Sequence, residues 1–368
     1  MKKYCLFVLL ISGLTYSQWV LDYQFTNGTI GVTSISVTDT NYIWICTIDS
    51  LFTRHVYKKS DQLVINVNTV GISSPMKLIA VDTTKAFLNA SDNRLYSTTN
   101  SGTNWRVCLD STFYGYDFSL SHSSPNFVVA GARIHDSDKS ALFISSNSGL
   151  NWIRQNIPFT EEYLIFDVKN TDPAHIYAGM NCPGGSCGNL QYLYTSNGGI
   201  NWQFKNFPLV SNNMTLLAPV FNLNNTIGFT FAAGFNFYRY KTTNSGFNWS
   251  QPEFFSLGNT EGMQGIMNID STSIWFCATS EKVYKTTNDG INWSEMTIPL
   301  TTGEFITGFD FIRNGNKYYG YLATGSENGK IYKLVELISP IGIHPISTEI
   351  PKSFSLSQNY PNPFNPVT

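Results

Sequence analysis

The sequence is poor in charged residues and has no excess of either sign. Lys, Arg, Asp and Glu make up 13% of the 368 residues, and the formal net charge is −2. Binding to nucleic acid or to anionic lipid depends on clustered Lys and Arg side chains. We therefore expect no nucleic-acid partner for this chain.

Signals for a bound metal or nucleotide are also lacking. The five His residues are scattered without the spacing of metal ligands, and no Gly-rich loop leads from a strand into a helix. We accordingly expect no cofactor and no metal site.

Apolar runs of any length are confined to the N-terminus. Lys2 and Lys3 precede an apolar stretch from Cys5 to Ile11, and Thr15 and Ser17 stand at the −3 and −1 positions of a cleavage before Gln18. This pattern predicts a secretory signal peptide over residues 1–17. The alternative, an N-terminal membrane anchor, is disfavoured because the run is about half of the ~20 residues that a span needs. We expect a mature chain without a transmembrane segment, secreted or held at the outer cell surface after passage through the periplasm.

Aromatic residues and glycine are abundant, and they recur in a repeat. Aromatics reach 15% and there are 28 Gly, which favours short strands joined by tight turns. Five segments, called the repeat corners below, share one pattern: TTNSGTNW (Thr98–Trp105), SSNSGLNW (Ser145–Trp152), TSNGGINW (Thr195–Trp202), TTNSGFNW (Thr242–Trp249) and TTNDGINW (Thr286–Trp293). Their spacing of 44 to 50 residues is typical of propeller blades with four strands each.

Each repeat corner has the chemistry of a hairpin turn. An Asn can bond its own backbone, a Gly two positions later supplies a positive φ, and a Trp then buries a large apolar face. We interpret these residues as structural rather than as calcium ligands or sugar platforms. They are Asn100, Gly102 and Trp105; Asn147, Gly149 and Trp152; Asn197, Gly199 and Trp202; Asn244, Gly246 and Trp249; and Asn288, Gly290 and Trp293.

Counting the repeat gives a closed ring. Degenerate copies at Tyr57 and Tyr332 add two units to the five, so we predict a single all-β propeller of seven four-stranded blades over residues 18–337, with six blades as the alternative. The strand that begins at Gln18 resembles those that follow the repeat corners. We expect it to complete the C-terminal blade, which removes exposed sheet edges.

The repeat corners resemble the Asp-box, or BNR, repeat of sialidases, sortilin-type receptors, xyloglucan hydrolases and photosystem-II assembly-factor-like propellers. Asn replaces the Asp of that motif in every copy here, and Asn also replaces the Thr before Trp. The resemblance implies the hairpin and says little about activity. In that family the turn typically lies on the outer edge of a blade, away from the ligand face.

The C-terminal residues carry a second resemblance. A linker over residues 338–352 precedes residues 353–368, which are similar to the opening of the type A sorting domain of the type IX secretion system. Such domains continue for several dozen residues, so we expect the sequence given to stop inside one. The resemblance implies the secretion machinery as a partner, and its residues are Gln358, Asn359, Tyr360, Pro361, Asn362, Pro363, Phe364, Asn365 and Pro366.

Five cysteines follow the predicted signal peptide, in a compartment that permits disulfides. Cys182 and Cys187 bracket a short Pro-Gly-Gly-Ser loop and are the candidate bridge, preferred over a metal site. Cys46 and Cys277 lie in similar apolar segments and are expected to be buried, whereas the pairing of Cys108 is open.

The sequence does not identify an active site. Carboxylates precede the expected inner strands at Asp117, Glu161, Glu162, Glu261 and Glu304, around the mouth of the channel. Two of them could serve glycoside hydrolysis if they approached one another. The Arg-Ile-Pro signature of sialidases is only partly matched, so catalysis is the alternative hypothesis. The favoured one is a non-catalytic propeller that binds a protein or a glycan through its loops, two of which, residues 133–139 and 182–187, are insertions.

Overall fold

The computed structural model describes residues 18–26, 28–61, 63–110, 113–134, 140–158, 164–181, 190–207, 215–222, 224–233, 236–257, 263–269, 273–325 and 328–338. The chain divides into a first unit, Met1–Leu337, and a second, Ile338–Thr368. The predicted signal peptide, linker and sorting segment lie outside the described residues, apart from Ile338, and stay predictions.

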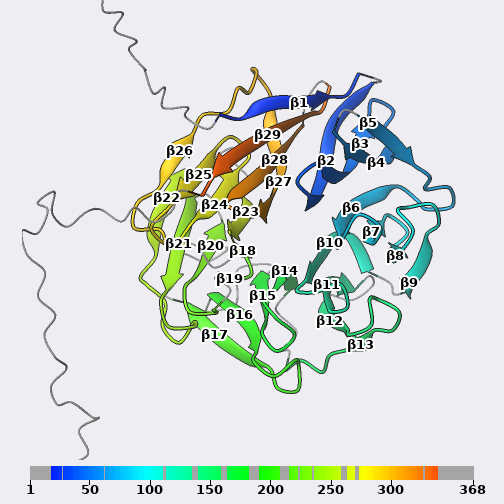
Figure 1. The fold of residues 1–368 in the computed structure, drawn as a ribbon. Helices are drawn as coiled ribbons and strands as arrows, with labels where there is room; N and C mark the ends of the chain where they lie inside the picture. The colour runs from blue at the N-terminus through cyan, green and yellow to red at the C-terminus, as the bar shows by residue number, and fades with distance from the viewer. Residues whose placement is uncertain are drawn as a thin grey trace, which may run out of the picture. The chain divides into compact units, whose positions relative to one another are not determined.

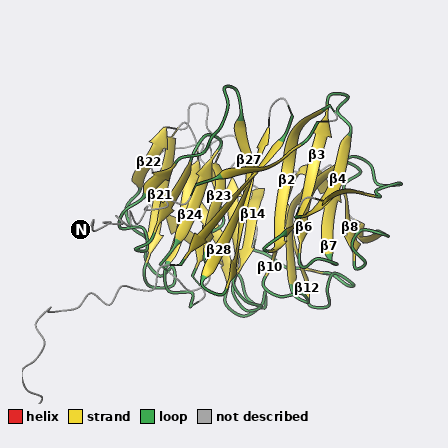
Figure 2. Cartoon of the chain, turned by 45° about the horizontal axis from the view of Figure 1, so that its top comes forward, coloured by secondary structure: helices red, strands yellow, loops and turns green. Residues whose placement is uncertain are grey.

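The first unit is an all-β propeller, as the sequence predicts. Strand pairing among the described residues is antiparallel and gives five sheets, three of four strands, one of eight and one of nine. In chain order the strands fall into seven groups, with the eight- and nine-stranded sheets each divided into two groups. Figure 1 shows these groups following one another around a central axis, with β2, β10, β14, β23 and β27 innermost. Figure 2 shows the strands of the ring standing side by side, joined by loops at both ends.

The first four groups have the following bounds. The first is β2 (Thr29–Asp39), β3 (Tyr42–Asp49), β4 (Arg54–Ser60) and β5 (Leu63–Val67). The second is β6 (Pro75–Ala80), β7 (Ala86–Ala90), β8 (Arg94–Thr98) and β9 (Arg106–Asp110). The third is β10 (Phe113–His122), β11 (Val128–Ile134), β12 (Ser140–Ser145) and β13 (Ile153–Arg154). The fourth is β14 (Leu164–Asn170), β15 (Ile176–Asn181), β16 (Leu190–Thr195) and β17 (Gln203–Phe207).

The remaining groups complete the ring. The fifth has a divided inner strand, and it is β18 (Thr215–Leu216), β19 (Val220–Phe221), β20 (Gly228–Ala233), β21 (Asn236–Thr242) and β22 (Glu253–Leu257). The sixth is β23 (Met263–Asn268), β24 (Trp275–Thr279), β25 (Val283–Thr286) and β26 (Ser294–Met296). The seventh is β27 (Phe305–Asn314), β28 (Lys317–Gly325), β29 (Lys330–Leu337) and, from the other end of the chain, β1 (Val20–Gln24).

The repeat corners are closed by short-range hydrogen bonds that all five copies share. At the first corner the Thr98 hydroxyl accepts the N–H of Gly102 at 2.9 Å, and the Asn100 side-chain oxygen accepts the N–H of Asn104 at 3.0 Å. Two consecutive residues then have positive φ, Ser101 at 59° and Gly102 at 78°. The side-chain oxygen of the Asn is thus engaged within its own turn, as the turn chemistry predicts.

The Trp of each repeat corner packs on the group before its own. Trp105 makes an edge contact with Trp44 at 6.3 Å between ring centroids, and Trp293 makes one with Phe229 at 5.9 Å. Trp202 lies in a buried cluster with Leu142 of the preceding group. The corners therefore join neighbouring sheets as well as turning the chain.

Replacing a corner glycine tests this packing. A Cβ at Gly149 would lie 2.4 Å from the Phe87 ring, whereas one at Gly71, which also has a positive φ, would meet nothing within 4 Å. We expect Gly71→Ala to cost about 1–2 kcal/mol from the backbone alone and Gly149→Ala to cost about 1–3 kcal/mol more from overpacking. Chemical denaturation of both variants measures the difference, and equal losses would contradict this packing.

Closure by the N-terminal strand is confirmed. β1 pairs antiparallel with β29, in a register that runs from Val20 opposite Lys333 to Gln24 opposite Lys330. An ion pair holds β1 to the first group, because the Lys59 Nζ lies 2.6 Å from a carboxylate oxygen of Asp22 and the Lys59 side chain is only 3% exposed. The ring is therefore tied at its seam by a buried pair of charges.

Breaking this pair should loosen the seam. Lys59→Ala leaves the Asp22 carboxylate poorly solvated and without its partner, and we expect a loss of about 3–5 kcal/mol in the free energy of unfolding. Arg94→Ala removes an exposed pair with Asp110 and should cost about 1 kcal/mol or less. Urea denaturation of the two variants compares them, and a Lys59→Ala loss no larger than the control would show that the seam does not depend on the pair.

Candidate functional site

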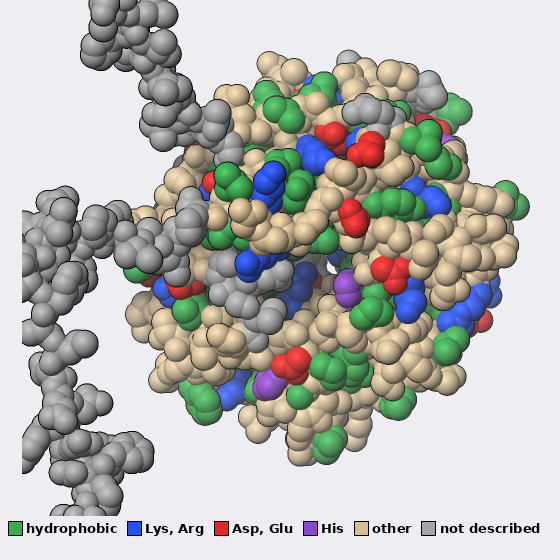
Figure 3. Space-filling view, in the orientation of Figure 1, with side chains coloured by type: hydrophobic (Ala, Val, Ile, Leu, Met, Phe, Trp, Pro, Cys, Tyr) green, Lys and Arg blue, Asp and Glu red, His purple; other side chains and the backbone are tan. Residues whose placement is uncertain are grey.

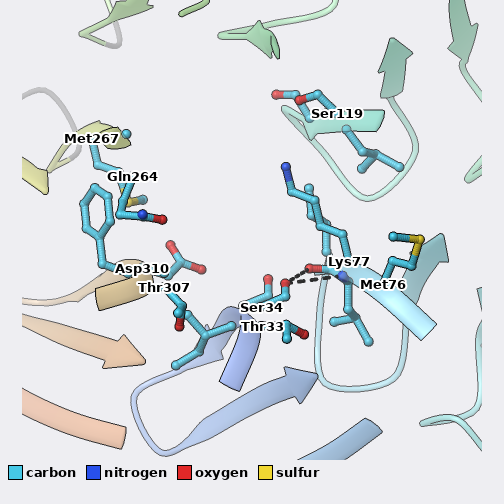
Figure 4. Close-up of a pocket in the computed structure, with 18 of the residues that line it drawn as sticks. Thr33, Ser34, Met76, Lys77, Ser119, Gln264, Met267, Thr307 and Asp310 are labelled. Atoms are coloured by element: carbon cyan, nitrogen blue, oxygen red, sulfur yellow. Dashed lines mark hydrogen bonds between the residues drawn. The ribbon is translucent and has the colours of Figure 1, made fainter. Parts of the chain in front are cut away.

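A central channel runs between the inner strands and encloses a cavity of about 640 Å³. Its wall is built from β2, β6, β10, β23 and β27, with Lys169 added from β14 and Arg54 from β4. Figure 3 shows the hollow at the middle of the ring with Lys and Arg side chains around it. Figure 4 shows Lys77 and Asp310 on different parts of the wall, with Gln264 and Thr307 near Asp310.

The inner strands satisfy one another's backbone through side chains. The Ser34 and Ser36 hydroxyls of β2 accept the N–H groups of Leu78 and Ala80 on β6, at 3.3 and 3.0 Å. Across the next boundary the His122 ring donates to the carbonyl of Ala80. An unpaired strand edge is costly when buried, so these bonds stabilise each junction.

The same device continues around the ring. Ser119 and Ser121 of β10 accept the N–H groups of Val168 and Asn170 on β14, both at 3.1 Å. A carboxylate oxygen of Asp310 on β27 accepts the N–H of Val37 on β2 at 2.7 Å. The serines, His122 and Asp310 of the wall are therefore engaged in holding the ring together.

Two lysines of the channel differ from this pattern. Lys77 is exposed to the channel and has no side-chain partner among the described residues. Burial by the surrounding wall lowers the pKa of its ammonium group, and the positive charge of Lys169 adds to this effect, whereas Asp167 opposes it. The Lys169 side chain is 42% exposed and lies 3.9 Å from the Asp167 carboxylate. That carboxylate also accepts bonds from Ser119 and Ala218, and it offsets part of the positive charge of the two lysines.

Asp310 is the one carboxyl residue among the described residues of the channel lining. Burial raises the pKa of its carboxyl group to about 6, against the hydrogen bonds from the Val37 and Phe311 N–H groups and the positive charge of Lys169. The His122 ring is shifted in the direction of the neutral form, because burial lowers its pKa. Among the described residues of the lining, Lys77, Lys169 and Arg54 thus accompany a single carboxyl group, that of Asp310.

A second hollow of about 520 Å³ adjoins the channel and shares Arg54 with it. It lies between the loop that joins β3 to β4 and the loop that joins β5 to β6, and its lining includes His55 and Asn68. The loop from β3 to β4 holds the same place in its group as the 133–139 insertion does between β11 and β12. Phe52 and Val70 stand at this hollow with 75% and 92% of their surface exposed.

The predicted carboxylates are not brought together among the described residues. Glu304 is buried, and its oxygens accept bonds from Thr301, Thr324, Lys330 and Tyr332. These bonds lower the pKa of Glu304 although burial acts to raise it. The side chains of the other four candidates, Asp117, Glu161, Glu162 and Glu261, lie outside the described residues.

Some of the remaining sequence candidates are described by the structure, and others lie outside the described residues. Cys46 and Cys277 are buried and unpaired, and burial raises the pKa of the Cys46 thiol to about 12. Cys108 is also unpaired. The predicted Cys182–Cys187 bridge and the charged part of the 133–139 loop fall outside the described residues, and the bridge stays a prediction. Within the described part of the chain, no three His, Cys, Asp or Glu side chains are grouped to hold a metal ion, and no helix could span a membrane.

Sequence reasoning missed Lys77, Lys169 and Asp310. Each is a polar residue inside an apolar inner strand, in the segments MKLIA, FDVKN and FDFI. Polar residues that alternate with apolar ones on such a strand face the channel. That alternation was the available signal.

Comparison with known proteins supports the fold alone. No protein-family model and no curated protein matches the chain. A solved structure described as YCF48 bound to D1 peptide is 13% identical over 88% of this chain and 96% of its own, with a TM-score of 0.60. YCF48 from Cyanidioschyzon merolae is 14% identical over 86% and 98%, with a TM-score of 0.58. A GH74 enzyme from Niastella koreensis is 12% identical over 83% and 65%, with a TM-score of 0.49.

The raised pKa of Asp310 makes stability depend on pH. Because the folded protein holds this proton more tightly than an ordinary carboxyl of pKa 3.8, the associated stability is present below about pH 4 and is lost as the pH rises through about 6. Asp310→Asn cannot ionise and keeps an oxygen for the Val37 N–H. We expect it to gain on the order of 2 kcal/mol relative to wild type between pH 4 and pH 7. Denaturation midpoints across that range measure the gap, and a constant gap would contradict the assignment.

Proposed function

We propose that this chain is a non-catalytic propeller of the cell exterior that binds a glycan or a protein through its central channel and the loops at its mouth. The observation that carries this proposal is the chemistry of the channel wall. Its serines and Asp310 are committed to the backbone of neighbouring strands, while Lys77 and Lys169 remain directed to the cavity. Such a wall can hold a ligand and offers no carboxylate pair among the described lining residues.

The surroundings of Glu304 support binding over glycoside hydrolysis. A general acid needs a raised pKa and access to the glycosidic oxygen. Glu304 is buried behind Tyr332 and Lys330 and has a lowered pKa, so it meets neither requirement. YCF48, which has the same fold, is described in complex with a peptide, and this supports a binding role for a propeller of this size.

We propose export by the type IX secretion system, on the residues from Gln358 to Pro366 that resemble its sorting domain. We further propose that the repeat corners are a variant of the Asp-box, with Asn in place of Asp. The hydrogen bonds of Asn100 and its four counterparts support that structural reading.

The proposal is tested by presenting the purified chain to a glycan array and to surface extracts of the source cells, with a parallel screen for release of reducing sugar. We expect retention of one glycan or protein class and no hydrolysis. Protease treatment of intact cells checks surface exposure of the chain. Turnover of a glycoside that is lost in Glu304→Gln would overturn the non-catalytic assignment, and full protection from the protease would overturn the exposed location.

A further inference from the structure

We propose that the channel and the second hollow together bind an acidic oligosaccharide, with one charged sugar between Lys77 and Lys169 and the following sugars along Arg54 and Phe52. This inference rests on the proposed binding function and specifies its ligand class. The two hollows adjoin at Arg54, which lines both.

The positive side chains of the described channel lining favour an anionic ligand. Lys77, Lys169 and Arg54 line the cavity with a single carboxyl, that of Asp310, counted over the described lining residues, and Asp167 behind the wall offsets one further positive charge. Lys77 has no side-chain partner in the described part of the chain, and Lys169 forms a long ion pair of 3.9 Å with Asp167. An ammonium group enclosed by protein is stabilised by an anion that replaces its lost water. The cavity of about 640 Å³ lies within the range of about 300–1,000 Å³ that is usual for small-ligand sites.

The wall disfavours an extended peptide in the channel. Peptides that add to a sheet gain affinity from main-chain hydrogen bonds to an exposed strand edge. Here the N–H groups of Val37, Leu78 and Val168 already bond to side chains of the neighbouring inner strands. An acidic peptide would therefore have to rely on its side chains alone.

Neutral polar groups and an aromatic ring fit a sugar. Gln264 lines the cavity and offers an amide group that can both donate to and accept from a sugar hydroxyl. Beyond Arg54, the exposed Phe52 ring offers an apolar face on which the C–H face of a sugar can pack.

The loop that carries Phe52 is held in place before any ligand arrives. Phe52 has a φ of 61°, which is unfavourable for a bulky residue. The Asp49 carboxylate fixes this conformation by accepting the N–H groups of Leu51 and Thr53 at 2.9 and 2.8 Å, and its other oxygen lies 3.0 Å from the His55 ring. Stored strain with an exposed aromatic ring is a feature of binding loops.

The test is a calorimetric titration of the purified chain with trigalacturonate, trimannuronate and a hyaluronan tetrasaccharide, each beside a methyl-esterified counterpart. We expect at least one acid to bind and its ester to bind about tenfold or more weakly. Lys77→Met and Lys169→Met should each weaken the acid by about tenfold while leaving the ester unchanged. Lys317→Met, at an exposed lysine outside both hollows, is the matched control and should have no effect.

Phe52→Ala tests the second hollow independently of the channel. We expect it to weaken the binding of a trisaccharide more than that of the corresponding disaccharide. Thermal melts check that each variant is folded. Binding of none of the three acids, equal binding of acid and ester, or preference for a hexaglutamate peptide would overturn this inference. If a neutral glycan or a protein still binds in the array experiment, the general binding function survives, so the two failures are distinguishable.

Discussion

The inner strands of this ring cannot pair with one another along their length, and the structure depends on how their backbone groups are satisfied instead. Serine hydroxyls, a histidine ring and aspartate carboxylates reach from one inner strand to the backbone of the next. An N–H group left without a partner would cost about 1–3 kcal/mol at each place. These bonds therefore fix the spacing of neighbouring sheets, and with it the width of the channel.

This constraint also decides which channel residues are free to meet a ligand. Asp310 has the raised pKa that is often a mark of catalytic carboxyls. Its oxygens, however, accept the N–H groups of Val37 and Phe311, so its position is set by the joint between β27 and β2. In the described part of the chain, neither Lys77 nor Lys169 bonds to the backbone of a neighbouring inner strand. The positive character of the described lining therefore comes from lysines whose ammonium groups are not bonded to the backbone of a neighbouring strand.

The fold was predictable from the sequence where the interactions are local. The repeat corners depend on hydrogen bonds within four residues, so TTNSGTNW and the four similar segments predict these corners directly. The pairing of β1 with β29 followed from the likeness of the first strand to those after the corners. The channel was not predictable, because Lys77 and Lys169 become neighbours only when separate sheets assemble. Glu304 shows the same limit, since its partners Lys330 and Tyr332 lie 26 and 28 residues away and turn a candidate acid into a buried anchor.

The position of β29 has a mechanical consequence. It is the last strand before residue 338, and it is bonded on one side to β28 and on the other to β1. Tension applied through the residues that follow would be shared between two neighbouring strands and sheared along their length, rather than peeling a free edge. A propeller tethered by its C-terminus would in this way carry load through the same seam that joins the two ends of the ring.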